Sequence, residues 1–216
     1  MDMRIKDENK KREIFFATIE TINKVGFVNI SMSKIAKEAG VSTSTLYTYY
    51  ENKEDMFQKV YNEAKKHMLG FCLNDIDIHS QTKKAIRKLC WNIHNYVEKY
   101  NEYFMFLEQA NNSPLIDLSL DSDVNLLLEK STQLFEQGIA GGELKDLSPY
   151  LLNCFCFYPI TQLHKNSYLK NGEKQDIDFE SVFHLVWDAI KNNGLTSNLV
   201  TYTNKFHKFY YVTSIV

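Results

Sequence analysis

Glycine and proline are rare in this chain, at 8 and 3 of its 216 residues. A β-sandwich or β-barrel needs many tight turns, and these two residues supply most of them. Long stretches instead repeat apolar side chains every three or four positions, the spacing of one face of an α-helix. A hydrophobic fraction of 44% excludes a disordered chain, because so much apolar surface can form a core. The chain is therefore predicted to be all-α.

About nine helices are predicted from this spacing and from the residues that start and stop helices. Three helices are expected first, at about residues 10–25, 32–39 and 43–50. Six longer ones follow, at about residues 53–72, 81–100, 102–111, 123–139, 149–170 and 179–193. Pro159 is predicted to kink the eighth helix. Residues 195–216 show no helical phase, which leaves an appended strand, a packed tail or an artificial extension.

The segment at residues 31–53 has the pattern of two short helices joined by a tight turn, a helix-turn-helix. Ser31 and Ser42 are typical N-cap residues, and Gly40 readily takes the left-handed backbone of such a turn. Four apolar residues are expected to form the small core between the helices, namely Ile35, Ala36, Val41 and Leu46. The second helix then exposes short hydroxyls and tyrosines, which can contact base edges, thymine methyl groups and phosphates.

This segment strongly resembles the DNA-binding part of the TetR family of transcription regulators. The matching residues are the helix at 14–26, Ser31-x-x-x-Ile35-Ala36-x-x-Ala39-Gly40-Val41-Ser42, and Thr45-Leu46-Tyr47-x-Tyr49-Tyr50-x-Asn52-Lys53-Glu54-x-Met56. The resemblance implies a helix-turn-helix DNA-binding domain at residues 1–52. It further implies a helical regulatory and dimerisation domain at 53–194, followed by the tail of uncertain structure at 195–216.

The resemblance also implies which residues contact DNA. It places Thr43, Ser44, Thr45 and Tyr47 in the major groove, Ser31, Thr48, Tyr49 and Lys53 near phosphates, and Ser33 near bases or backbone. Many relatives have Lys-Gly where this chain has Thr43-Ser44. Since the second helix then has no cation to read guanine, we expect an operator rich in A·T pairs, read partly by methyl contacts and by shape.

Charge gives weak support for DNA binding by residues 1–52, which are called the head below. Through Lys53 the chain has nine Lys and Arg against seven Asp and Glu, and the remainder has sixteen against twenty. The first cations, at Arg4, Lys6, Lys10, Lys11 and Arg12, either contact phosphates or form a solvated start of the first helix.

The aromatic residues of the later helices have two interpretations. Most must be core, but aromatic rings mixed with a few polar groups also line pockets for planar apolar ligands. The candidate effector-binding residues are Phe71, Trp91, Asn95, Tyr103, Phe106, Phe135 and Tyr158. The last two helices are expected to pair with those of a second copy, with Phe155, Phe179, Phe183, Val186 and Trp187 as candidate interface residues.

The sequence thus predicts a ligand-responsive regulator, first of all a homodimeric repressor that releases a palindromic operator when a small apolar or aromatic effector binds. The alternative is a protein of the same fold that tethers DNA or binds a protein partner without any small-molecule effector. An enzyme is not expected, because no catalytic constellation or phosphate-binding loop is present. No cofactor is expected either.

A metal site and a membrane segment are also not expected. The histidines lack ligand spacing, and the four cysteines lie in apolar surroundings typical of buried free thiols. No apolar run reaches the roughly 20 residues that cross a bilayer, and the N-terminus has no apolar signal core. The expected location is the cytoplasm.

Overall fold

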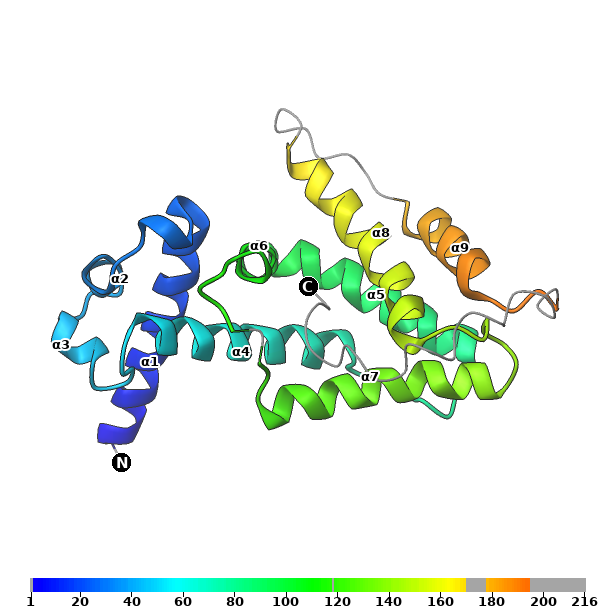
Figure 1. Cartoon of the computed structure of the whole chain (residues 1–216), viewed down its shortest axis with the longest axis horizontal. Coiled ribbons are helices and arrows are strands. Elements are labelled where there is room, and N and C mark those ends of the chain that lie inside the picture. Colours follow the sequence, from blue (N-terminus) through cyan, green and yellow to red (C-terminus); the bar gives the residue numbers. More distant parts are fainter. Residues whose placement is uncertain (1, 118, 170–177, 195–216) are drawn as a thin grey trace. The chain divides into compact units, whose positions relative to one another are not determined.

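The structure, a computed structural model, describes residues 2–117, 119–169 and 178–194. These residues form nine α-helices and one short 3-10 helix, so the all-α prediction is confirmed (Figure 1). The elements are α1 Asp2–Val25, η1 Phe27–Asn29, α2 Met32–Glu38, α3 Thr43–Leu46, α4 Lys53–Cys72, α5 Thr82–Lys99, α6 Asn101–Asn111, α7 Ser122–Ala140, α8 Pro149–Leu169 and α9 Phe179–Ile190. The tail predicted at residues 195–216 lies outside the described residues.

Helices α1 and α3 differ most in length from the sequence prediction. Helix α1 starts at Asp2 rather than near Lys10; half of its first eight residues (Met3, Arg4, Lys6 and Glu8) are good helix formers, although they lack an apolar phase. Helix α3 ends at Leu46 rather than near residue 50. The carbonyl oxygen of Leu46 accepts hydrogen bonds from the N–H groups of both Tyr49 and Tyr50 (3.0 Å each), so the chain closes there in a tight turn.

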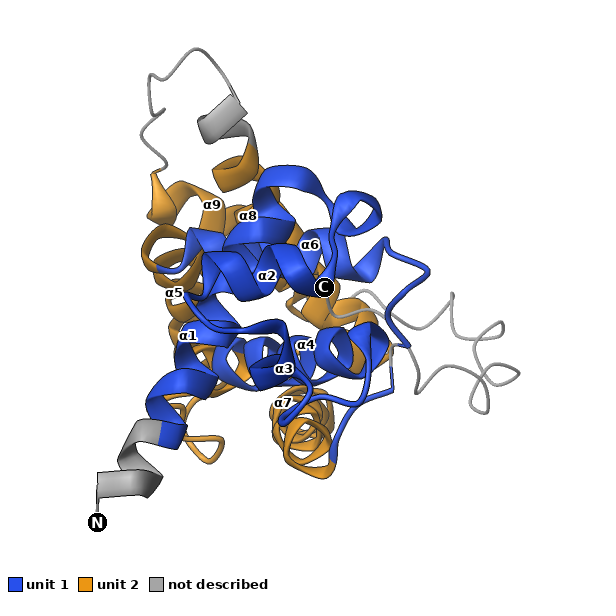
Figure 2. Ribbon diagram, turned by 90° about the vertical axis from the view of Figure 1, so that its left-hand side faces the viewer, with its two compact units in different colours: residues 1–68, 100–121, 216 blue, residues 69–99, 122–215 orange. Residues whose placement is uncertain are grey.

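The chain divides into two compact units (Figure 2). The first contains residues up to Met68 together with Tyr100–Asp121, and therefore includes α1 to α3, most of α4, and α6. Helix α6 packs on α1, where Asn23 Nδ2 donates to the carbonyl oxygen of Glu102 (2.8 Å) and Gln109 Nε2 donates to Asn23 Oδ1 (3.0 Å).

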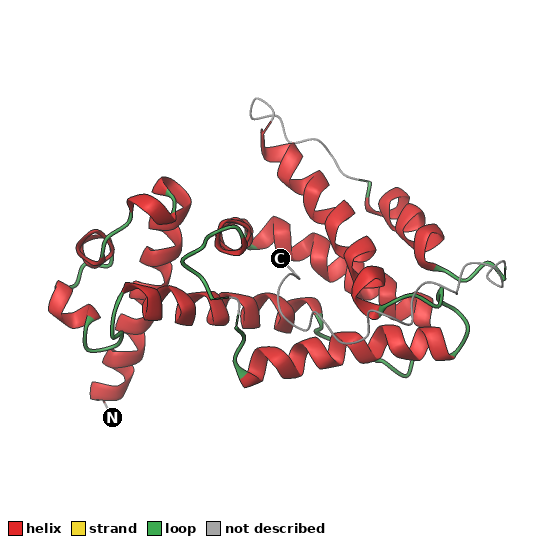
Figure 3. Cartoon of the chain, viewed as in Figure 1, coloured by secondary structure: helices red, strands yellow, loops and turns green. Residues whose placement is uncertain are grey.

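The second unit contains Leu69–Lys99 and the residues from Ser122 onward. Its described part consists of helices and loops, apart from one isolated bridge between Leu144 and Lys191 (Figure 3). Helix α8 packs against α5, α7 and α9. The core between these four helices includes the fully or almost fully buried Ile86, Cys90, Phe135, Cys156 and Phe183.

The unit boundaries do not coincide with the division predicted after residue 52. Helix α6 packs with the N-terminal helices, and the boundary of the first unit falls inside α4. Compactness does not assign function, so the functional division into residues 1–52 and 53–194 stays a prediction.

Gly138 of α7 marks a place where α5, α7 and the following loop approach closely. A Cβ atom at this position would lie 2.6 Å from both Leu144 Cδ1 and Thr82 Cγ2, whereas one at Gly70 of α4 would meet nothing within 4 Å. We expect Gly138→Ala to destabilise the protein by about 1–3 kcal/mol, because the overpacking outweighs the better helix propensity of alanine. Gly70→Ala is the control and should leave stability unchanged or raise it by about 0.5–1 kcal/mol. Urea denaturation followed by circular dichroism measures the free energy of unfolding of both variants. Equal free energies would contradict the close packing around Gly138.

Candidate nucleic-acid interface

Two serine caps and a glycine turn set the geometry of α2 and α3. Ser31 Oγ accepts a hydrogen bond from the N–H of Lys34 (3.3 Å), and Ser42 Oγ accepts one from the N–H of Thr45 (3.1 Å). Gly40 has a φ of +65°, a left-handed backbone that costs other residues roughly 1–2 kcal/mol. The predicted helix starts and the turn between them are confirmed.

A small apolar core holds α2 and α3 together. Ile35, Ala36 and Leu46 are almost completely buried, and Val41 is half-buried. The N–H of Val41 donates to the carbonyl oxygen of Ala36 (2.9 Å), which closes the turn against the end of α2. With so few side chains in this core, truncating Leu46 would cost about 2–5 kcal/mol.

The opposite side of this segment carries the predicted DNA contacts. Ser31, Ser33, Ser44, Tyr47 and Thr48 are exposed, and Thr43, Thr45, Tyr49 and Lys53 are half-buried. Tyr47 keeps 55% of its surface exposed although the preceding Leu46 is fully buried, since successive residues point about 100° apart around a helix. All nine predicted residues therefore reach the surface.

The hydroxyl groups of α3 are ordered by one another. Ser42 Oγ lies 2.7 Å from Ser44 Oγ and 2.8 Å from Thr45 Oγ1. Thr48 Oγ1 donates to the carbonyl oxygen of Thr45 (2.7 Å). Because a hydroxyl can donate once and accept twice, these groups keep hydrogen-bonding capacity for a ligand while their positions are already restricted.

Tyr49 is tied to α1. Its phenol donates a hydrogen bond to the Asp7 carboxylate, and this bond raises the pKa of Tyr49 because it favours the neutral phenol. The Nζ atom of Lys11 lies 5.6 Å from the centre of the Tyr49 ring. The sequence did not predict the hydrogen bond between Tyr49 and Asp7, because 42 positions separate the two residues and no local motif joins them.

Helix α4 begins next to this surface with a cap of its own. Asn52 Oδ1 accepts from the N–H of Asp55 (2.8 Å), and the Asp55 carboxylate accepts from the N–H of Glu51 (3.0 Å). The two bonds resemble a capping box, except that the N–H of Glu51 rather than that of Asn52 is the returning donor. The Nζ atom of Lys53 lies 5.9 Å from the centre of the Phe57 ring at the start of the helix.

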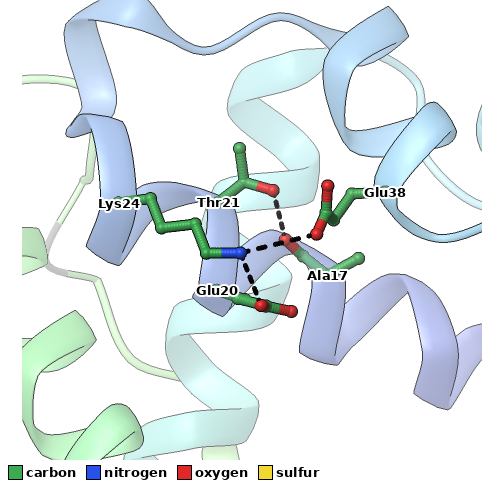
Figure 4. Close-up of polar contacts among 5 residues, drawn as sticks. All are labelled: Ala17, Glu20, Thr21, Lys24 and Glu38. Atoms are coloured by element: carbon green, nitrogen blue, oxygen red, sulfur yellow. Dashed lines mark hydrogen bonds and ion pairs between the residues drawn. The ribbon is translucent and has the colours of Figure 1, made fainter.

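Lys24 links α1 to α2 (Figure 4). Its Nζ atom lies 2.6 Å from Glu20 Oε1 on α1 and 3.6 Å from Glu38 Oε1 on α2. The hydrogen bond to Glu20 raises the pKa of Lys24. Beside it, the hydroxyl of Thr21 donates to the carbonyl oxygen of Ala17 (2.6 Å) within α1. The ion pairs are exposed, so they orient α2 more than they stabilise it.

The predicted effector-binding residues are divided between the two units. Tyr103 and Phe106 belong to the first unit, and Phe71, Trp91, Asn95, Phe135 and Tyr158 belong to the second. Phe106 is fully buried with its ring 6.0 Å from that of Phe27, so it is core of the first unit. Trp91 is partly exposed and stacks on His94, at 5.3 Å between ring centres. The role of the seven residues stays a prediction.

The predicted interface residues also separate into two groups. Phe179, Phe183 and Val186 are buried within the second unit, where the guanidinium of Arg87 lies over both phenylalanine rings (5.4 and 6.0 Å). Phe155 is 48% exposed, and Trp187 is half-buried. Phe155 is thus the most available of the five for a second copy.

Buried polar groups on α4, α5 and α8 escaped the sequence reasoning. Burial lowers the pKa of Lys65 to about 7, while the nearby Glu108 acts in the opposite direction. Lys65 lies four residues after Tyr61 and three before Met68 on the apolar face, so the helical phase contained this signal. In the second unit, His94 Nδ1 and His164 Nε2 share a hydrogen bond of 2.8 Å, for which no sequence pattern exists.

Neither metal-binding groups nor membrane spans were found in the described part of the chain. No group of three or more His, Cys, Asp or Glu side chains there is arranged to hold a metal ion. None of its helices combines the length and the apolar character needed to cross a bilayer.

A capped helix-turn-helix with a hydroxyl-rich outer side, in an all-α chain, defines a DNA-binding regulator of transcription. Residues 14–60 match the model of the bacterial regulatory proteins of the tetR family, and residues 82–191 match a tetracyclin repressor-like C-terminal domain. The chain belongs to the tetR family and, like the family, is a transcriptional regulator and not an enzyme. The family predicted from residues 10–60 is confirmed.

Individual relatives match most of the chain. The fatty acid metabolism regulator protein of Bacillus subtilis is 25% identical over 198 residues, which cover 85% of this chain and 96% of that protein. The crystal structure of a TetR family transcription regulator from Marinobacter aquaeolei has a TM-score of 0.79 at 25% identity and covers 88% of this chain and 100% of its own. FadR from Bacillus subtilis, solved in complex with stearoyl-CoA, has a TM-score of 0.63 at 22% identity and covers 82% and 96%, which supports the fold.

Proposed function

We propose that this regulator is a homodimeric repressor that binds a palindromic operator through α3 and releases it when a long-chain acyl-CoA binds. The main support for this DNA-binding site is the exposed, hydroxyl-rich side of the α2–α3 segment. The caps at Ser31 and Ser42 and the buried Leu46 fix the two helices that form it. Tyr47 is one of the predicted major-groove residues and has more than half of its surface exposed.

Selection from random-sequence DNA duplexes tests the site and the operator together. We expect enriched palindromes with half-site centres about 34–36 Å apart. The half-sites should be rich in A·T pairs, because residues 43–50, which are α3 and the turn after it, have hydroxyls and tyrosines but no cation for guanine. Tyr47→Ala should weaken binding to the selected duplex about 10-fold or more, measured by fluorescence anisotropy, since a good base contact contributes about 1–3 kcal/mol.

Leu126→Ala is the matched control, because Leu126 is a similarly exposed apolar residue on α7 of the other unit. It should leave the operator affinity unchanged. Equal affinities of Tyr47→Ala and the unmodified protein would remove α3 as the reading element, and G·C-rich half-sites would contradict the proposed reading of bases.

Dimer formation is supported by an apolar face on α8 and α9. Leu151, Phe155 and Tyr158 follow one another at helical spacing on α8 and are each about 40–50% exposed, and Leu185 on α9 is 73% exposed. When exposed apolar residues form a large patch, that patch often marks a site of protein–protein association. A two-fold pairing of these helices would give each dimer two copies of α3.

Phe155→Glu is expected to convert the dimer into a monomer, because the pairing would bury an unpaired carboxylate. Light scattering coupled to size-exclusion chromatography measures the mass, and operator binding should fall together with the dimer fraction. Leu126→Glu introduces the same charge on exposed α7 and should remain dimeric. A dimer that survives Phe155→Glu would place the interface elsewhere.

The relatives support the choice of effector. One is named a fatty acid metabolism regulator and another was solved with stearoyl-CoA. An acyl chain is also the kind of ligand for which a helical body rich in apolar and aromatic side chains is suited. In place of the small apolar or aromatic effector expected from the sequence, we therefore propose a long acyl chain on coenzyme A.

Palmitoyl-CoA should weaken operator binding and raise the melting temperature. At one hundred times its Kd a ligand that binds only the folded state adds about 2.7 kcal/mol, which corresponds to several degrees. Free coenzyme A, which lacks the acyl chain, is the control and should do neither. Operator binding that ignores palmitoyl-CoA, without any thermal shift, would favour the alternative of a DNA-tethering or partner-binding protein without this effector.

A further inference from the structure

Asp7 places a negative charge on the side of the head where Tyr49 and Lys11 lie. Its carboxylate accepts the hydrogen bond of the Tyr49 phenol. Lys11 follows one turn later on α1, and its Nζ atom lies 5.6 Å from the centre of the same ring. A carboxylate and a cation from α1 therefore meet at one tyrosine of the turn after α3. Asp7 and Lys11 are both exposed, and Tyr49 is half-buried.

The phenol of Tyr49 has a single proton to donate. A phosphate of the DNA backbone presents the same kind of acceptor as a carboxylate, an anionic oxygen. Tyr49 can therefore donate to Asp7 or to a phosphate, but not to both. In the structure this proton is directed to Asp7, and the Asp7 charge would also oppose any phosphate that approached Lys11.

We propose that Asp7 competes with an operator phosphate for the hydroxyl of Tyr49 and so limits the affinity of the head for DNA. The inference rests on the proposed function and on the predicted place of Tyr49 near a phosphate of the operator. Asp7 stands in for the phosphate in the free protein, and DNA binding requires that the Tyr49–Asp7 bond is exchanged for a Tyr49–phosphate bond.

The opposite role for Asp7 is to hold Tyr49 ready for DNA, and the two roles differ in the sign of one measurement. A competitor lowers affinity, so removing its charge tightens binding. An organiser raises affinity, so removing its charge weakens binding. Charge favours the competitor, because an aspartate beside the phosphate backbone reduces the favourable effect of neighbouring cations.

The test measures operator affinity of Asp7→Asn and Asp7→Ala on the selected duplex over a series of salt concentrations. We expect both to bind about 3- to 10-fold more tightly at low salt, with a salt dependence of log Kd that steepens by up to about one. Glu13→Gln removes a charge from a different face of α1, six residues on, and should change the affinity less. Melting temperatures establish that the compared variants are equally folded.

Tyr49→Phe separates competition for the hydroxyl from a simple charge effect. If the two compete, Asp7→Asn should gain less affinity in the Tyr49→Phe background than in the unmodified protein. An equal gain in both backgrounds would overturn the role of Tyr49. Weaker binding by Asp7→Asn, or a gain no larger than that of Glu13→Gln, would overturn the proposal as a whole.

The Tyr47→Ala variant distinguishes failure of this inference from failure of the proposed function. Loss of binding in Tyr47→Ala with no gain in Asp7→Asn leaves the DNA-binding site in place and rejects only the competitor. Full binding by Tyr47→Ala rejects the site on which both rest.

Discussion

The packing of α2 against α3 around Leu46 is the interaction on which the rest of the head depends. A turn of four residues cannot remain helical by itself in water, because helix nucleation costs more than one turn returns. Helix α3 persists because Leu46 is buried against α2, Ser42 caps its first turn, and Gly40 allows the chain to reverse without strain. These three local conditions fix the direction in which Tyr47 and its neighbouring hydroxyls face.

In the proposed function, the α3 part of this surface recognises DNA without a positive charge of its own. Its α3 segment has three hydroxyl residues and no lysine or arginine, and Asp7 adds a negative charge beside Tyr49. Nonspecific affinity for DNA is mostly electrostatic. A head with few cations therefore binds nonspecific DNA weakly and loses little binding free energy when it leaves such a site. Discrimination between sequences would then rest on base contacts and DNA shape, which would suit the proposed release of an operator in response to a modest coupling free energy.

In the proposed function, a signal that arises in the second unit would have to reach the first. Within the described residues the chain passes between the units at three places, inside α4, between α5 and α6, and just before α7. Helix α6 also packs directly on α1 through Asn23 and Gln109. A change in the second unit could therefore act on the head through α6, which belongs to the first unit, as well as through α4, which crosses the boundary between the units.

Local sequence determined the parts of this protein whose physics is local. The helical phase, the serine caps, Gly40 and the match over residues 10–60 were sufficient for the all-α fold, the family and the nine surface residues of the head. Only the tertiary structure decided which groups meet across distance. It showed that Phe179, Phe183 and Val186 are buried in their own unit, that α6 packs on α1, and that Tyr49 donates to Asp7. Helical periodicity shows that a side chain lies on an apolar face, but it does not show which surface covers that face. A hydrogen bond between residues 42 positions apart leaves no signal in the sequence around either partner.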